Sequence, residues 1–242
     1  MTSTVTGRLT GVGVGPGDPG LVTVRAVEVL QAADRVFVPV AATGEPGYAE
    51  RVVLAHARHQ RVTRLTFALG DDPAARQASW DAAGEAVAVV LAGGGHAAFA
   101  TIGDPNLYST FTYLADTVRA LAPGPVIDSV PGITAMQDLA ARAGLVLAEG
   151  TQTVALLPFT AGAQRLAAAL DAHDTVVTYK GGRHLPRVRA VVADAGRTAD
   201  AVFGARLGLD GETVGGLPAT GAAPYLSTVI VTRPRGERGG RL

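Results

Sequence analysis

Cysteine is absent from the 242 residues of the chain. Its absence excludes disulfide bonds, thiolate metal sites and a cysteine nucleophile, and it is typical of a protein kept in a reducing compartment. The five histidines show no spacing typical of a metal site; although His56 and His59 could share a helical face, we interpret them as a surface pair. We therefore predict that the protein holds no metal.

The chain also lacks an excess of charge of either sign and an uninterrupted hydrophobic run. Its 21 basic and 21 acidic side chains balance, so no broad electric field draws it to nucleic acid or to anionic lipid. The most apolar stretch, residues 86–102, is interrupted by three consecutive glycines and His96, and residues 1–10 contain no apolar signal core. We predict a cytoplasmic protein that binds neither nucleic acid nor membrane.

What the chain does contain is a regular alternation of short β-branched runs with longer stretches rich in alanine and leucine. This pattern is typical of α/β folds built on a largely parallel sheet. In the first half it predicts strands near 8–14, 35–39, 61–67, 97–102 and 125–129, and helices near 21–33, 47–58, 73–92 and 107–121. Thr23 is the predicted N-cap of the first helix, and Val24, Val27, Leu30 and Gln31 share one of its faces.

The second half predicts another α/β unit, with a mixed sheet. Its expected elements are a helix near 133–143, strands near 152–157, 174–179, 199–206 and 226–232, and helices near 163–171 and 185–195. Proline and glycine residues gather between about 122 and 131 and mark a boundary. The predicted fold is therefore α/β, with two α/β domains at 1–124 and 125–242.

The first strand runs into a loop with five glycines and two prolines, residues 11–20. Three of the glycines satisfy the G-x-G-x-x-G pattern of a dinucleotide-binding loop. The prolines remove two backbone donors, however, and Asp18 places a carboxylate where a pyrophosphate would lie. Three interpretations remain open: a dinucleotide site, a turn that only joins strand to helix, and a loop that presents its backbone to another ligand.

Three further segments repeat the same arrangement, an apolar strand that stops at a glycine- or proline-containing turn and leads into a helix. They are residues 98–110, 127–137 and 175–187. Each alone could be a simple helix-entry turn. Because parallel sheets bind ligands at the carboxyl ends of their strands, the four loops together predict a ligand cleft between the two domains.

These segments resemble the tetrapyrrole methylase family over nearly the whole chain. The resemblance is carried by GVGVGPGDPGLVT at 11–23, AADRVFV at 32–38, GDPNLYST at 103–110, SVPGITA at 129–135 and YKGGR at 179–183. Within the family, the stretches at 103–114 and 129–150 most resemble the enzymes that methylate C20 of precorrin-2. The fold implied by the resemblance has two α/β domains.

The resemblance implies S-adenosylmethionine as the methyl donor. The family's cofactor positions fall on Pro16, Gly103, Asp104, Leu107, Tyr108, Thr134, Ala135 and Tyr179. Many relatives have methionine at the place of Tyr179, and the alignment also permits Lys180 there. The related uroporphyrinogen III methylases carry an aspartate, assigned as a base, at the place of Pro39. That role is not transferred, and we assign no catalytic residue.

The tetrapyrrole implied by the resemblance carries eight carboxylates, which arginine recognises through paired hydrogen bonds. The expected substrate contacts are Gly15, Gly17, Asp18, Arg183 and His184. Lys180, Arg187 and Arg189 complete a cationic cluster, although Arg187 and Arg189 are equally compatible with an exposed helix face.

Two further expectations concern the GDP loop. In a G-D-P turn a carboxylate more often binds backbone N–H groups or a ligand than acts as a base, so we expect Asp104 to hold the loop or the cofactor. Tyr108 and Tyr113 are five residues apart and do not share a helical face. Only Tyr108, which is nearer the loop, is expected to reach the cleft.

The expected function is therefore methyl transfer from S-adenosylmethionine to C20 of precorrin-2, giving precorrin-3A in cobalamin biosynthesis, by a homodimer. One alternative is another transmethylase of the family, acting on a different ring carbon or on cobalt-precorrin-2. An alternative of a different class is an NAD-dependent oxidoreductase or a nucleotide-binding module without catalysis.

Overall fold

The computed structural model describes residues 6–41, 45–68, 70, 72–122 and 124–234. The chain divides into two compact units, residues 1–134 and 135–242. Each unit is a sheet with helices, so the predicted α/β fold class is confirmed. The division follows Thr134 and does not lie at 124/125, because β5 (Val126–Val130) pairs with β1 (Arg8–Gly13) and completes the first sheet.

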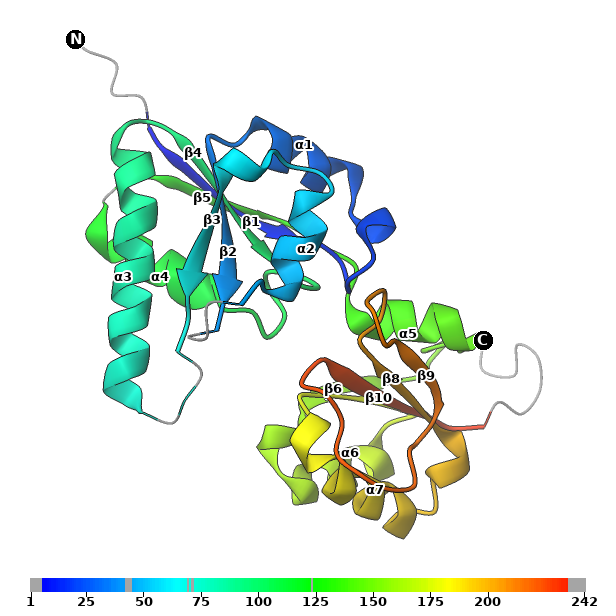
Figure 1. Ribbon diagram of the computed structural model, residues 1–242. Coiled ribbons are helices and arrows are strands. Elements are labelled where there is room, and N and C mark those ends of the chain that lie inside the picture. The colour runs from blue at the N-terminus through cyan, green and yellow to red at the C-terminus, as the bar shows by residue number, and fades with distance from the viewer. Residues whose placement is uncertain (1–5, 42–44, 69, 71, 123, 235–242) are drawn as a thin grey trace. The chain divides into compact units, whose positions relative to one another are not determined.

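The sheet of the first unit has five strands in the order β3-β2-β4-β1-β5 (Figure 1). The remaining strands are β2 (Arg35–Val40), β3 (Val62–Thr66) and β4 (His96–Thr101). Every pairing in this sheet is parallel, which confirms the parallel sheet predicted for this half. All five strands therefore end at the same edge.

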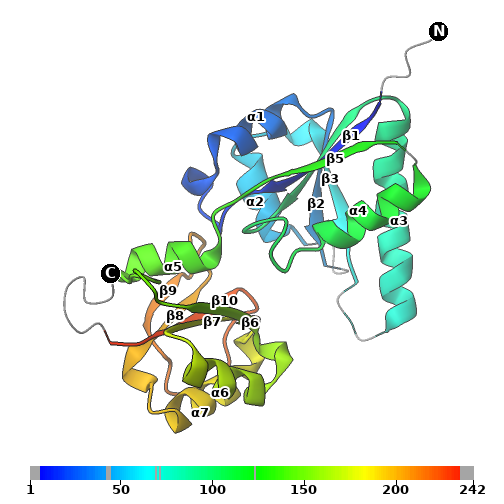
Figure 2. The same ribbon diagram turned by 180° about the vertical axis from the view of Figure 1, so that it is seen from behind.

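Two helices cover each face of this sheet (Figures 1 and 2). On one face, α1 (Val24–Ala32) and α2 (Tyr48–Leu54) pack a valine-rich cluster against the strands. On the other, α3 (Pro73–Ala92) and α4 (Phe111–Leu121) pack leucine, valine and phenylalanine side chains. Strand residues alternate between the two clusters, as the two-residue period of a strand requires.

Thr23 caps α1 as predicted, since its hydroxyl oxygen accepts a hydrogen bond from the Ala26 N–H at 3.2 Å. Of the four residues predicted to share a face, only Leu30 is fully buried, and Val24 is 77% exposed. The helix also buries Ala26 and Val29. Apolar residues occur on more than one side of this helix, so their spacing alone did not identify the buried side.

Two predicted helix boundaries were also wrong. Helix α2 ends at Leu54, so His56 and His59 lie in the segment after it and share no helical face. Helix α4 begins at Phe111, which leaves residues 107–110 in a loop. The side chain of Ser109 explains this second boundary, because its hydroxyl oxygen accepts the N–H of Phe111 at 3.1 Å and closes a turn there.

The sheet of the second unit has the order β6-β7-β10-β8-β9. Its strands are β6 (Val154–Pro158), β7 (Thr175–Tyr179), β8 (Ala201–Ala205), β9 (Thr213–Gly216) and β10 (Ser227–Thr232). The β6–β7 pair is parallel and the other pairs are antiparallel, which confirms the predicted mixed sheet. Strand β9, at the edge, was not predicted.

Helices cover both faces of this sheet as well. Helix α5 (Ala135–Ala143) packs Leu139 and Ala140 on one face. Helices α6 (Ala163–Ala172) and α7 (Leu185–Asp194) pack on the other. Each unit therefore has a core of its own on both sides of its sheet.

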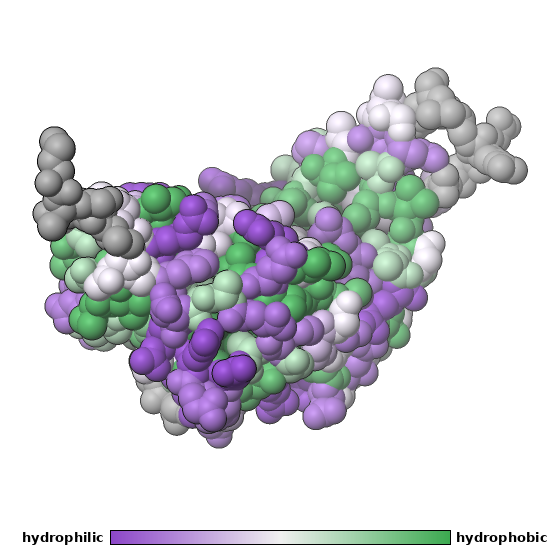
Figure 3. All heavy atoms as spheres, turned by 90° about the horizontal axis from the view of Figure 1, so that it is seen from above, coloured by the Kyte–Doolittle hydropathy of each residue, from purple (hydrophilic) through white to green (hydrophobic). Residues whose placement is uncertain are grey.

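Among the described residues, no helix is both long and apolar enough to cross a membrane. The face drawn in Figure 3 mixes hydrophilic and hydrophobic residues.

Candidate active site

Three loops of the first unit follow β1, β4 and β5, the three neighbouring strands at one side of its sheet. The loop after β1 leads to α1 on one face, and the loop after β4 leads to α4 on the other. Neighbouring strands whose loops leave toward opposite faces form the switch point at which open α/β sheets bind ligands. We call these segments the opening loop (14–23), the GDP loop (102–110) and the PG turn (131–134).

The opening loop and the GDP loop are joined through their backbones. The Gly103 N–H donates to the Gly15 carbonyl oxygen at 2.7 Å, and the Val14 N–H donates to the Thr101 carbonyl oxygen at 2.9 Å. Gly15 and Gly103 have φ angles of 76° and 71°, a conformation that glycine adopts without strain. Gly15, a predicted substrate contact, and Gly103, a predicted cofactor contact, are therefore joined directly through their backbones.

Close packing brings the PG turn onto the same two loops. A Cβ atom placed on Gly13 would lie 2.5 Å from the Gly132 nitrogen and 2.6 Å from the Gly103 carbonyl oxygen. A Cβ on Gly132 would collide with the same carbonyl oxygen. Only glycine at these places lets the three backbones approach so closely.

Asp104 fastens the GDP loop to the PG turn. Its Oδ1 atom accepts the Asn106 N–H at 2.8 Å, and its Oδ2 atom accepts the Gly132 N–H at 3.0 Å. The side-chain amide of Asn106 donates to the Ser129 hydroxyl at 3.2 Å, a second link from the GDP loop to β5. The carboxylate thus binds backbone N–H groups, one of the two roles expected of it.

Asp18 closes its own turn in the opening loop. Its Oδ1 atom accepts the Gly20 N–H at 2.7 Å and caps a short 3₁₀ helix at Pro19–Leu21. The Pro19 carbonyl oxygen lies 2.9 Å from Nε2 of His56, which ties the loop to the segment after α2. Pro16 is buried beside Gly17, whose φ of 155° again suits glycine.

The two tyrosines near the GDP loop have different surroundings. Tyr113, on α4, stacks on Trp80 of α3 with ring centroids 4.6 Å apart and an interplanar angle of 7°. Tyr108 lies in the loop, is 42% exposed, and has a φ of 53°. Such a backbone conformation costs a non-glycine residue about 1–2 kcal/mol and is frequent at ligand sites. Burial of part of the ring raises the pKa of the Tyr108 hydroxyl.

The GDP loop keeps an open side next to Gly103. The nearest atom to a Cβ placed there, Cα of Thr134, would be 4.0 Å away. Leu107 and Thr134 are half-buried at this side of the unit. Backbone beside partly buried apolar and hydroxyl groups, in loops without a basic side chain, suits a ligand without phosphate groups better than a pyrophosphate. The residues expected to hold S-adenosylmethionine, whose sulfonium is a cation, thus fit such a group.

In the second unit, Tyr179 ends β7 and lies at the start of α5. Its hydroxyl oxygen accepts the Met136 N–H at 3.2 Å, next to Ala135, the first residue of that helix. The first N–H groups of a helix have no partner within the helix, so this contact caps α5.

Lys180 follows directly and has a φ of 59°. Partial burial of its amine lowers the pKa of Lys180 from its usual value. It is the only lysine of the chain, and the neighbouring glycines, 181 and 182, are buried. A strained, partly desolvated cation at the end of a strand is typical of a ligand-binding position.

The predicted cationic cluster after β7 divides in the structure. Arg183 and His184 stay together, with the Arg183 Nε–H donating to Nε2 of His184 at 3.1 Å. The His184 ring also packs on Phe159, with centroids 5.9 Å apart. Arg189 instead donates to the Pro218 carbonyl oxygen at 3.2 Å, and Arg187 is exposed on α7.

Sequence reasoning missed Gly13 and Gly132 as site-building residues, and it missed Asn106. The two glycines carried a signal, since one ends a strand and the other follows a proline. Their contact with the GDP loop depends on the register of β1 against β4 and β5, which local sequence does not contain.

Comparison with known proteins shows which family the sequence matches. The model of the tetrapyrrole (corrin/porphyrin) methylases matches residues 8–220. A precorrin-2 C(20)-methyltransferase of a Sinorhizobium species is 35% identical over 96% of this chain and 97% of its own. A cobalt-precorrin-2 C(20)-methyltransferase of Salmonella typhimurium is 30% identical over 94% of this chain and 97% of its own.

A solved structure supports the same fold. Uroporphyrin-III C-methyltransferase of Thermus thermophilus, in complex with S-adenosylhomocysteine, superposes with a TM-score of 0.65 at 19% identity. The match covers 93% of this chain and 97% of that one.

Proposed function

Because the chain belongs to the tetrapyrrole methylase family, we propose that it transfers a methyl group from S-adenosylmethionine to C20 of precorrin-2, giving precorrin-3A. The observation that carries this proposal is the near-full-length similarity to two relatives named for C20 methylation, at 35% and 30% identity. The arrangement of the three loops supports it, since they form a backbone surface without a phosphate-binding side chain.

For cofactor binding we propose the loop residues Pro16, Gly103, Asp104, Leu107, Tyr108 and Thr134, with Ala135, Tyr179 and Lys180 of the second unit. The loops of the first unit offer backbone groups at positive-φ glycines, and the GDP loop has an open side. Asp104 acts through position: it holds the GDP loop against the PG turn through Gly132.

The cofactor supplies a methyl group already activated by a sulfonium. What the chain must contribute is alignment of the substrate carbon with that methyl and exclusion of water, and such positioning is worth about 7–11 kcal/mol. Loops that hold the cofactor rigidly favour this alignment. The backbones of Gly13, Gly103 and Gly132 are packed so closely that the loops have little room to move.

For the substrate we propose contacts with Gly15, Gly17 and Asp18 of the opening loop and with Arg183 and His184. The tetrapyrrole is rich in carboxylates, and the guanidinium of Arg183 can donate from its two terminal nitrogens while Nε remains on His184. His184 thereby orients the arginine. Arg187 and Arg189 are left out, because one is exposed on its helix and the other is bound to a backbone carbonyl.

Two measurements test this proposal: the first tests which cofactor the protein binds, and the second tests whether it methylates precorrin-2. Calorimetry should give tight binding of S-adenosylhomocysteine and none of NAD, because the opening loop has two prolines and a carboxylate where a pyrophosphate needs donors. NAD binding with no response to S-adenosylhomocysteine would refute the proposal. Incubation with precorrin-2 and S-adenosylmethionine should then give a product that carries one additional methyl group.

Cobalt-precorrin-2 is a second candidate substrate, favoured by the Salmonella relative that is named for it. An assay with metal-free and cobalt-bearing precorrin-2 side by side separates the two by their kcat/KM values. We further propose that the enzyme acts as a cytoplasmic homodimer, as the family resemblance implies, and light scattering on the purified chain tests the dimer.

A further inference from the structure

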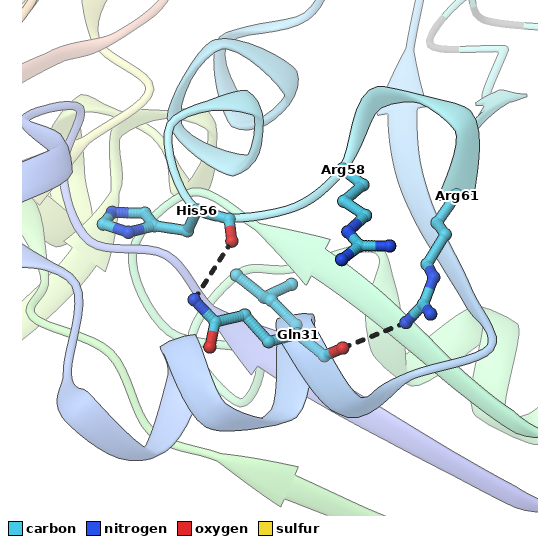
Figure 4. A pocket seen from close by; sticks show the side chains of 5 residues that line it. Gln31, His56, Arg58 and Arg61 are labelled. Atoms are coloured by element: carbon cyan, nitrogen blue, oxygen red, sulfur yellow. Dashed lines mark hydrogen bonds between the residues drawn. The ribbon is translucent and has the colours of Figure 1, made fainter.

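A cavity of about 330 Å³ lies in the first unit, between the end of α1 and the segment after α2 (Figure 4). Its lining residues are Leu30, Gln31, His56, Arg58 and Arg61. The segments that carry Gln31 and Arg61 lead directly into β2 and β3. Because all strands of this sheet are parallel, the two arginines lie toward the edge where strands begin, opposite the three loops.

Positive charge dominates this cavity, since none of the described residues that line it is acidic. From Ala55 to Thr66 the sequence contains three arginines and two histidines and no aspartate or glutamate. One of these arginines, Arg64, is neutralised by Glu50 through two hydrogen bonds of 2.8 and 2.9 Å. The other two, Arg58 and Arg61, line the cavity.

Arg61 is held in a fixed place. Its Nη1 atom donates to the carbonyl oxygens of Gln31 and Ala33 at 3.0 and 3.1 Å, where α1 ends. Two backbone carbonyls offset part of the charge and leave the other guanidinium nitrogens for a ligand. A guanidinium that is anchored in this way loses less freedom when it binds an anion.

Arg58 lies beside it, and within the described part of the chain no hydrogen bond or ion pair involves its guanidinium. In Figure 4 both arginines extend toward Gln31, while the His56 ring points away from them toward the opening loop. The imidazole is bound to the Pro19 carbonyl oxygen at 2.9 Å. The anion-binding groups are therefore the two guanidinium groups, and His56 forms a wall.

We propose that this cavity binds a small oxyanion, the phosphate or carboxylate group of a small molecule. Two adjacent guanidinium groups match the two or three oxygens of such a group through paired, charge-assisted hydrogen bonds. The volume falls at the lower end of small-molecule pockets, which suits an oxyanion with a short organic portion. Within the first unit, the two arginines lie at the opposite edge of the sheet from the opening loop, which carries the proposed substrate contacts Gly15, Gly17 and Asp18.

The test is an NMR titration of the full chain with inorganic phosphate and, separately, with citrate, both at constant ionic strength. Saturable shifts are expected in the amides of residues 30–35 and 56–62. Arg58→Gln should weaken the affinity by about tenfold or more, the loss expected for charged hydrogen bonds. Arg119→Gln, which removes the same charge from an exposed position on α4, should leave the affinity unchanged.

A response to phosphate alone or to citrate alone supports the proposal and identifies the oxyanion. Three outcomes would overturn it: no saturable response to either probe, shifts centred on residues 180–184, or equal weakening by Arg58→Gln and Arg119→Gln. None of these outcomes depends on methyl transfer, so the inference stands or fails separately from the proposed function.

Discussion

The loops of the first unit and the turn after β7 in the second unit are built in different ways. In the first unit, glycine backbones contact one another directly, and the carboxylate of Asp104 holds the GDP loop against the PG turn. In the second unit, side chains provide the candidate ligand contacts. They belong to Tyr179, Lys180, Arg183 and His184, each of which has a hydrogen-bond partner or a left-handed backbone conformation. Ligand recognition in the first region therefore depends on the shape of the backbone, and in the second region on the chemical groups of the side chains.

This difference predicts a division of labour. A backbone surface recognises a ligand by fit and tolerates no added atoms, so changes there should act on stability and cofactor affinity together. A side-chain surface recognises charge, so changes there should act on one ligand and leave the fold intact. Each of the four substitutions below tests one part of this division.

Gly132→Ala should have the largest effect. The new Cβ would meet backbone atoms of Gly103 and Gly13, and backbone cannot move aside as a flexible side chain can. We expect a loss of about 3 kcal/mol in the free energy of unfolding, the upper end for overpacking, together with loss of S-adenosylhomocysteine binding. Urea unfolding and calorimetry measure the two. As a control, Gly93→Ala places its Cβ 3.6 Å from the nearest atom and should change neither.

Asp104→Ala should have the second largest effect. It leaves the N–H groups of Asn106 and Gly132 without their acceptor and should cost about 2 kcal/mol in stability. The cofactor Kd should rise more than the substrate KM, because the GDP loop loses its link to the PG turn. Asp72→Ala removes a similar turn-closing carboxylate at the start of α3 and should leave the cofactor Kd unchanged. An unchanged Kd in Asp104→Ala would remove Asp104 from the account.

Arg183→Ala should act on the substrate alone. We expect KM to rise about tenfold, at the lower end for a charged hydrogen bond, with stability and cofactor Kd unaffected. Arg165→Ala, an exposed arginine on α6, is the control for loss of charge in the same unit. If Arg183→Ala weakens cofactor binding instead, the side-chain surface does not recognise the substrate as proposed.

Lys180→Met should give the smallest change, visible in the pH dependence of stability. Burial lowers the pKa of Lys180 in the folded chain. Between that lowered pKa and the ordinary value of about 10.4, the unfolded chain therefore binds a proton that the folded chain does not. The free energy of unfolding should therefore rise with pH through this window, and Lys180→Met should lack that rise. Because it is the only lysine, urea unfolding of the two proteins from pH 7 to 10 isolates its contribution. Curves that stay parallel would contradict the burial of this amine.

Much of the fold could be predicted from the sequence, because strands and helices have different hydrophobic periods and Thr23 caps α1 in the usual way. Strand β9 was missed since Thr213–Gly216 contains two glycines and is exposed throughout, without a buried face to produce a pattern. The start of α4 was misplaced because the Ser109 hydroxyl decides it, and α1 carried apolar residues on two sides.

The candidate site divides along the same line. The GDP loop and the PG turn were found as motifs, and Asp104 was expected to hold either the loop or the cofactor; it binds two backbone N–H groups. The contact between Gly13 and Gly132 was not found, because it joins residues far apart in sequence through strand register. The left-handed backbone of Tyr108 and Lys180 was also beyond local patterns, since neither residue type favours it.

The central claim is tested most directly by incubating the enzyme with precorrin-2 and S-adenosylmethionine labelled with carbon-13 in its methyl group, and locating the label in the product by NMR. The account predicts a single labelled methyl group on C20. A labelled methyl group on any other ring carbon, or none on the tetrapyrrole, would contradict it.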